Sequence, residues 1–285
     1  LRLGPRSDHP SASPGSVLEL GVGRPAAAAS QAEGMLSEGG GPANPLTPRA
    51  FVDLHCHTRG SFDSLSDPAA VVRAAHVRGL THLAITDHDR IDEALRARDL
   101  APPRLTVIVG SEVRTRDGDL ICLFLERAIP PGLPAIEAIA AAREQGGLVG
   151  IPHPFDRFRS SLLNDPRLAD LAERVDWVET WNARIVGRAG NERAAEFARA
   201  HGLPGVAVSD AHSVLEVGLA YSVLVGDPST AAGLLGALPS AALVPGRASY
   251  VARLLTPVAK LVQRTRGHGR VPLGPADDPQ GGRDP

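Results

Sequence analysis

The chain has 285 residues, of which 43% are hydrophobic and 22% charged, and its formal net charge is −2. This composition is typical of a globular protein with room for one large α/β domain or two small ones. The charge argues against a globally basic nucleic-acid binder but leaves room for a local basic patch. Cys56 and Cys122, the two cysteines, suggest no disulfide framework and favour a reducing compartment.

The N-terminal part shows no targeting signal. No apolar run approaches the roughly 20 residues that a membrane helix needs, and the start of the chain lacks the apolar core of a signal peptide. We therefore expect a cytoplasmic protein with no membrane partner. Residues 1–49 are rich in Gly, Pro, Ser and Ala and are expected to be disordered. One hypothesis places the natural start at Met35, the only methionine.

From Phe51 onward, predicted strands and helices alternate. Strands are predicted at 51–57, 80–86, 104–115, 118–125, 148–153, 177–182 and 205–212. The third and fourth of these can pair through a turn at Asp117 and Gly118. Helices are predicted at 68–78, 134–147, 165–174, 189–201 and 228–238. This rhythm indicates parallel strands with crossover helices, in a barrel or a doubly wound sheet.

The C-terminal part is predicted to be a helix over 249–266, kinked or started by Pro257, with disorder from Gly267 onward. Six basic residues and no acid lie between Arg247 and Arg270. One interpretation is an amphipathic helix that docks on the barrel, and the other is contact with a phosphate backbone or a partner. The predicted organisation is a disordered segment 1–49, a domain 50–245, and a basic helix with a disordered tail over 246–285.

His55 and His57 raise the first question of function. Alternate residues of a strand point to the same face, so these two imidazoles should lie together, with Cys56 on the opposite face. Such a pair can hold one divalent metal, although two unrelated strand histidines would give the same pattern. The remainder of the chain has to decide between the two.

Further side chains that can bind a metal recur at or just after the predicted strand ends. They are His55, His57, Asp63, Asp87, His88, Glu112, His153, Glu179, Asn182, Asp210 and His212. In a parallel α/β barrel these ends meet at one face, where chemistry takes place. Histidines and carboxylates without a cysteine cluster suit Zn, Mn or Fe. Two or more ions could clamp a phosphoryl group for attack by metal-activated water, whereas no paired Ser or Cys nucleophile favours a covalent route.

The segments "DLHCHTRGSFDSLSDP", "GLTHLAITDHD", "GSEV", "IPHPFDRF", "VETWN" and "SDAH" occur in this order. Together they resemble the PHP (polymerase and histidinol phosphatase) superfamily, in the form of stand-alone bacterial proteins with a PHP-associated C-terminal region. The resemblance covers about Phe51 to Val225. It implies a distorted (β/α)7 barrel with a mostly trinuclear metal centre at the carboxyl ends of the strands.

The resemblance also implies a ligand set. The first metal would be held by His55, His57, Glu112 and Asp210, with Glu112 bridging to a second metal that His153 also binds. The third would be held by Asp63, His88 and His212. Asp87 and Arg184 are assigned to catalysis, Asp87 by fixing the loop or a histidine tautomer. Arg157, Arg184 and Asn182 are assigned to substrate binding, because guanidinium groups match phosphate oxygens. Arg159 is a further candidate, and surface charge is the alternative for each arginine.

One feature departs from the family pattern. Many members have another histidine on the second metal, whereas this chain has none from Asp89 to Pro152. We therefore expect two or three divalent ions. The expected activity is hydrolysis of a phosphomonoester or terminal phosphodiester of a nucleotide, a short oligonucleotide or a small phosphorylated metabolite. The alternatives are a histidinol-phosphate-type phosphatase and a catalytically weak, metal-bound structural or regulatory barrel.

Overall fold

The structure is a computed structural model that describes residues 48–156 and 168–269. Most of the two segments predicted to be disordered lies outside these residues. The strands are β1 (Arg49–Asp53), β2 (His82–Ile85), β3 (Thr106–Arg114), β4 (Asp119–Leu123), β5 (Leu148–Ile151), β6 (Trp177–Asn182), β7 (Gly205–Val208), β8 (Tyr221–Val225) and β9 (Ala242–Val244). The helices are α2 (Pro68–Val77), α3 (Asp92–Asp99), α4 (Ala135–Arg143), α5 (Leu168–Ala172), α6 (Ala189–Ala200), α7 (Ala231–Ala237), the 3-10 helix η1 (Leu238–Ser240) and α8 (Tyr250–Thr265).

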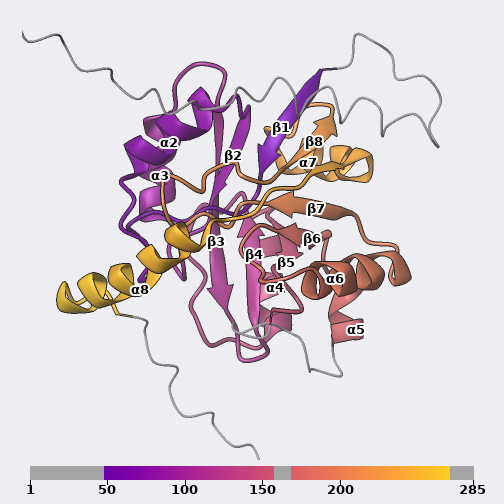
Figure 1. Ribbon diagram of the computed structural model, residues 1–285. Helices are drawn as coiled ribbons and strands as arrows, with labels where there is room; N and C mark the ends of the chain where they lie inside the picture. The colour runs from indigo at the N-terminus through magenta and orange to yellow at the C-terminus, as the bar shows by residue number, and fades with distance from the viewer. Residues whose placement is uncertain (1–47, 157–167, 270–285) are drawn as a thin grey trace, which may run out of the picture.

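Within the described residues, the strands form one sheet in the order β7-β6-β5-β4-β3-β2-β1-β8-β9. Strands β1, β2 and β3 are parallel to one another, as are β5, β6 and β7. Strand β4 is antiparallel to both β3 and β5, and β8 is antiparallel to β1. Helices α2 and α3 lie on one side of the strands and α6 on the other (Figure 1).

The β7 end of the sheet meets the segment after β1 and strand β8. Cys56 forms a parallel bridge with Ala211, and the His57 amide donates to the Ala211 carbonyl at 2.8 Å. The Ser222 hydroxyl of β8 also bonds the backbone of Ala207 in β7. The result is a nearly closed mixed barrel, which confirms the predicted α/β barrel. No helix in the described part of the chain is long and apolar enough to cross a membrane.

The barrel wall separates two apolar clusters. Val52, Ile108 and Trp177 belong to the cluster between the strands, whereas the other cluster contains the buried faces of α2, α3 and α4. On β3 and β6, the row that starts at Ile108 and Trp177 continues to Glu112 and Glu179 at every second position. The barrel interior is therefore apolar at one end and becomes polar toward the carboxyl ends of the parallel strands.

The predicted strand 51–57 is wrong at its end, because β1 stops at Asp53. Ala50, Val52 and Leu54 belong to the interior cluster, whereas Phe51 packs against the helix side. Strict alternation would therefore turn His55 and His57 away from the interior. The chain leaves regular pairing with β2 after Asp53, and this irregular backbone directs both imidazoles inward.

Other differences concern elements that the sequence did not reveal. Helix α3 was not predicted, because its sequence DEALRARD buries only Ala94 and Ala97 and has no apolar stripe. Strands β8 and β9 were also not predicted. The β3–β4 hairpin is confirmed, with Gly110 opposite Leu123 and Arg114 opposite Asp119.

Candidate metal centre

The centre lies where the chain leaves the carboxyl ends of the parallel strands. His55 and His57 follow β1, and their Nε2 atoms lie 2.9 Å apart. Both Nε2 atoms are 3.3 Å from Oε2 of Glu112, which projects from β3. Asp210, which follows β7, places Oδ1 at 3.6 Å from His55 Nε2 and 3.5 Å from His57 Nε2. All four side chains are buried, so imidazole and carboxylate donors converge away from solvent.

Two groups of donor atoms have a geometry that suits a metal ion. One comprises His55, His57 and Asp210, and the other comprises His57, Asp63, His88 and His212. Within each group, the donor atoms all lie within 4.8 Å of one another. Because His57 belongs to both groups, the two candidate ion positions adjoin each other. This arrangement is what a clamp of neighbouring ions requires.

Asp63 links the members of the second group. Its Oδ2 lies 3.2 Å from Nε2 of His212 and 3.7 Å from Nε2 of His88. Its Oδ1 is buried, and this atom has no hydrogen-bond partner among the described residues. A buried carboxylate oxygen without a partner is costly unless a cation or a donor accompanies it. The group therefore fits a hard or borderline divalent cation with N and O ligands.

His153 approaches the centre from the other side. Its Nε2 lies 3.1 Å from Oε1 of Glu112, and its buried Nδ1 has no hydrogen-bond partner among the described residues. The pair Glu112 and His153 does not belong to either of the two groups above. Strand β4 lies within the stretch from Asp89 to Pro152 that has no histidine, and it is buried along its whole length.

Three histidines have their Nδ1 atoms fixed by neighbours. Nδ1 of His55 donates to Oε1 of Glu179 at 2.6 Å, and Nδ1 of His212 donates to the Asp210 carbonyl at 2.9 Å. A backbone carbonyl can only accept, so Nδ1 of His212 carries a proton, and the contact of His55 Nδ1 with Glu179 likewise leaves Nε2 as the atom that can turn to a metal ion. Such outer contacts orient metal-binding imidazoles and tune their basicity.

His57 is fixed through a two-step relay. Its Nδ1 lies 2.8 Å from the Ser61 hydroxyl, which donates to Oδ1 of Asp87 at 2.9 Å. Since Ser61 gives its only proton to Asp87, it accepts the proton of His57 Nδ1. Asp87 also accepts from the backbone and hydroxyl of Thr58, at 2.6 and 2.5 Å. Asp87 therefore holds the loop after β1, and its assignment to catalysis stays a prediction.

Glu179 and Asn182 of β6 form the wall behind His55. Oε2 of Glu179 accepts from the His153 amide and from the Asn182 side chain, each at 2.9 Å. The Asn182 amide also donates to Oδ2 of Asp210 at 2.9 Å. Asn182 was assigned to substrate binding, but both of these contacts tie it to carboxylates of the centre. Glu179, treated from the sequence only as pocket lining, makes the shortest contact of His55.

The arginines differ in what the structure says about them. Arg157 and Arg159 lie outside the described residues. Arg184 is buried, and its guanidinium donates to Glu216 and, at 2.8 Å, to the Thr256 hydroxyl. Glu216 in turn accepts from the His212 amide at 3.2 Å. Arg184 therefore reaches the centre through Glu216, and its predicted contact with substrate stays untested.

The buried carboxylates of the centre change the pKa values of the histidines beside them. Burial would lower the pKa of His55, but Glu179, Asp210 and Glu112 raise it well above its usual range. Burial likewise opposes a charged His88, yet Glu112 and Asp63 raise its pKa to about 9. Burial lowers the pKa of His212 to about 3, so this imidazole is neutral and its Nε2 is a competent ligand.

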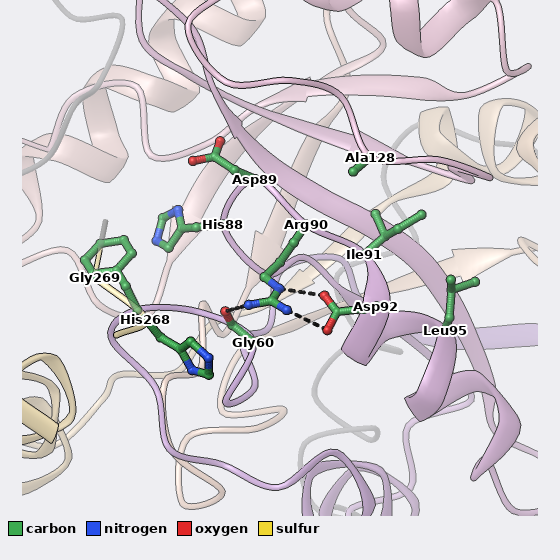
Figure 2. A pocket seen from close by; sticks show the side chains of 11 residues that line it. Gly60, His88, Asp89, Arg90, Ile91, Asp92, Leu95, Ala128, His268 and Gly269 are labelled. Carbon is green, nitrogen blue, oxygen red and sulfur yellow. Dashed lines mark hydrogen bonds and ion pairs between the residues drawn. The ribbon is translucent and has the colours of Figure 1, made fainter. Parts of the chain in front are cut away.

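A pocket of about 610 Å³ opens beside the centre and has His88 in its wall. Figure 2 shows Arg90 inside it, where the guanidinium donates to both Asp92 oxygens at 2.5 and 2.7 Å and reaches the Gly60 carbonyl at 3.5 Å. The Phe62 ring also lines the pocket and lies 4.8 Å from the His88 ring. This volume is within the range of pockets that hold small organic ligands.

Comparison with known proteins identifies the family. Residues 53–154 match the PHP domain, and residues 188–243 match the PHP-associated region. The chain belongs to the PHP family. An uncharacterized protein of Methanocaldococcus jannaschii is 37% identical over 142 residues, which cover 46% of this chain and 81% of that relative. The predicted family and its PHP-associated C-terminal region are thus confirmed.

Two further comparisons bear on the PHP chain. A 5'-3' exoribonuclease of Haemophilus influenzae is 29% identical over 120 residues, covering 36% of this chain and 42% of that enzyme. The solved structure of a two-domain protein from Bacteroides vulgatus, described as containing a predicted PHP-like metal-dependent phosphoesterase, is similar with a TM-score of 0.60. It is 19% identical and covers 72% of this chain and 67% of that one. At this identity the likeness supports the PHP fold alone.

Several residues of the centre carried no signal in the sequence. Ser61 and Glu216 are common polar residues in loops, and neither belongs to a spacing that suggests a ligand. Ser61 lies four residues after His57, within the quoted segment "DLHCHTRGSFDSLSDP". The sequence therefore shows that the two residues are near each other in the chain. Its role as acceptor for His57 depends on Asp87, which comes from a different strand end.

Proposed function

We propose that this PHP protein is a metal-dependent phosphoesterase that hydrolyses a phosphomonoester or a terminal phosphodiester by metal-activated water. The observation that carries the proposal is the pair of adjoining donor groups that share His57. The second group contains His88, which also lines the 610 Å³ pocket, so a ligand in that pocket would adjoin the candidate ions.

The ions would be held by His55, His57 and Asp210 in one group, and by His57, Asp63, His88 and His212 in the other. When bound, divalent ions supply a nucleophilic water near neutral pH and offset charge on the phosphoryl oxygens. The side chains of this chain do the positioning. Glu179 and Ser61 hold the imidazoles of His55 and His57, and the buried setting excludes bulk water.

The number of ions is proposed to be two, with a third position at Glu112 and His153 weaker or filled only at high metal concentration. Each of the first two positions has at least three side-chain donors in place. The third has a single imidazole and a carboxylate that also faces His55 and His57. Zn, Mn and Fe all suit this mixture of N and O donors.

The pocket indicates what kind of ester would fit. It combines the Phe62 ring and apolar side chains such as Ile91 and Leu95 with charged groups at Arg90 and Asp92. A phosphoryl group beside His88, with a nucleoside or similarly sized organic group over Phe62, would match this lining. The relative named as a 5'-3' exoribonuclease supports including terminal phosphodiesters of short oligonucleotides among the substrates to be tested.

The test is hydrolysis by chain loaded with Zn²⁺, Mn²⁺ or Fe²⁺, measured as phosphate or nucleotide release. The panel contains nucleoside monophosphates, short oligonucleotides, histidinol phosphate and other small phosphorylated metabolites. We expect His57→Ala to abolish hydrolysis and His76→Ala, on the exposed face of α2, to leave it unchanged. Tight metal binding without turnover on any ester would reject the phosphoesterase and favour a structural or regulatory barrel.

A further inference from the structure

Helix α8, the yellow helix in Figure 1, follows the last residue of either family match. It docks through a narrow face on which Ala252, Ala259 and Gln263 are buried. The helix contacts the loop that carries Asp63 directly and reaches the loop that carries His212 through Arg184. Neither family match includes this helix.

Gln263 makes the first connection. Its Nε2 donates to three backbone carbonyls, those of Arg59 at 2.7 Å, Ser61 at 3.0 Å and Ser64 at 2.9 Å. The side chain is 1% exposed. An amide has two N–H groups, so at least one proton is shared between carbonyls. Asp63 lies between Ser61 and Ser64 in the chain, so Gln263 fixes the backbone on both sides of this carboxylate.

Thr256 makes the second connection, two helical turns earlier. Its hydroxyl accepts from Arg184 at 2.8 Å, and the same guanidinium donates to Glu216. Oε2 of Glu216 accepts from the His212 amide at 3.2 Å and from the Ser213 hydroxyl at 2.8 Å. Each member of this chain of contacts except Thr256 and Ser213 is buried. Thr256 is therefore connected to the backbone of His212.

Both connections end at the same pair of donors. Oδ2 of Asp63 and Nε2 of His212 lie 3.2 Å apart in the group with His57 and His88. The loops also bond each other directly, because the Ser64 hydroxyl donates to the His212 carbonyl at 2.9 Å. None of these contacts reaches His55, whose position depends on Glu179.

We propose that α8 is a clamp that sets the spacing of Asp63 and His212, with Gln263 and Thr256 as positioning residues. This inference rests on the proposed function, because it takes the group of His57, Asp63, His88 and His212 to be an ion site. The clamp acts most strongly on the ion position that contains Asp63 and His212, whereas it reaches the position at His55, His57 and Asp210 only through the shared His57.

Two substitutions break the clamp and two serve as matched controls. Gln263→Met keeps an unbranched side chain of similar length but removes the N–H groups. Thr256→Val removes the hydroxyl, whereas Thr256→Ser keeps it. Thr265→Val is the second control, because Thr265 lies on the exposed side of α8 and its hydroxyl bonds to the Val262 carbonyl of the same helix. Loss of outer contacts of this kind weakens metal binding by about 10- to 100-fold.

The experiment measures Zn²⁺ bound per full-length chain after dialysis, together with stepwise affinities from a competing chelator. Circular dichroism checks the fold of each variant. We expect Gln263→Met and Thr256→Val to weaken binding of one ion by about 10- to 100-fold and binding of the other by clearly less. We expect Thr256→Ser and Thr265→Val to match the wild type. If Gln263→Met fails to fold, the comparison of Thr256→Val with Thr256→Ser decides the result.

Two results would overturn the clamp. The first is unchanged affinity for every ion in folded Gln263→Met and Thr256→Val. The second is equal weakening of all ions, which would assign α8 to general stability. Ester hydrolysis measured on the same samples separates this inference from the proposed function. If the wild type hydrolyses no ester but the variants lose one ion selectively, only the phosphoesterase is rejected. If the wild type is active and the variants bind every ion as the wild type does, only the clamp is rejected.

Discussion

Replacing Ser61 by alanine should weaken metal binding at both donor groups, because His57 belongs to both. The Ser61 hydroxyl is the acceptor for Nδ1 of His57 at 2.8 Å, and it also accepts from the His88 amide at 3.1 Å. Both His57 and Ser61 are buried, so Ser61→Ala leaves an imidazole N–H without a partner, at a cost of about 1–3 kcal/mol. Removing an outer contact of a metal-binding histidine typically reduces affinity about 10- to 100-fold, which is about 1.4–2.8 kcal/mol.

The assay is competition for Zn²⁺ between the chain and a fluorescent chelator, with Ser229→Ala as the control. The Ser229 hydroxyl donates to Asp227 and bonds to His82, neither of which belongs to the centre. We expect Ser61→Ala to lose at least tenfold in affinity for each ion and Ser229→Ala to match the wild type. A folded Ser61→Ala chain that binds every ion within about twofold of the wild type would refute the relay from His57 through Ser61 to Asp87.

Three further predictions concern stability and the outer residues. A Cβ at Gly150 would meet the buried Trp177 ring at 2.1 Å. Gly150→Ala should therefore lower the free energy of unfolding in urea by about 1–3 kcal/mol, and a change below about 0.5 kcal/mol would contradict the packing. Burial raises the pKa of Asp53 to about 6 from 3.8, so the folded state holds this proton more tightly than the unfolded state does. The unfolding free energy should therefore fall by about 3 kcal/mol as the pH rises from about 4 to above 6. Urea unfolding across pH 4–7.5 in chelator should show this fall in the wild type and not in Asp53→Asn; parallel curves would exclude it. Glu179→Gln should weaken Zn²⁺ binding about 10-fold or more by removing the carboxylate that accepts from His55, and chelator competition would show unchanged affinity if this contact were unimportant.

The barrel could be predicted from the sequence because buried strands alternated with helices, and because the hairpin of β3 and β4 has a recognisable Asp117-Gly118 turn. The course of β1 could not. Periodicity alone placed His55 and His57 on one face, but that face would have pointed to the helices had β1 continued beyond Asp53. The inward direction results from irregular backbone that pairs with the segment after β7, a contact between residues over 150 positions apart.

The candidate ligands could be recognised because histidines and acids at the strand ends form short motifs that occur in a fixed order. The assignment of these ligands to individual ion positions was less predictable. The resemblance assigns His57 to the first metal alone, whereas in the structure His57 belongs to both groups. The outer residues left no pattern, since Glu179, Ser61 and Gln263 act through partners that only the fold brings near.

The most direct test of the shared centre is anomalous diffraction from a crystal of this chain grown with Zn²⁺. The account predicts two adjoining peaks, each about 2.0–2.2 Å from its ligands, one at His55, His57 and Asp210 and one at Asp63, His88 and His212. His57 should lie within reach of both. Zn²⁺ found only at other residues, or a single peak that leaves Asp63 and His212 without contact, would contradict it.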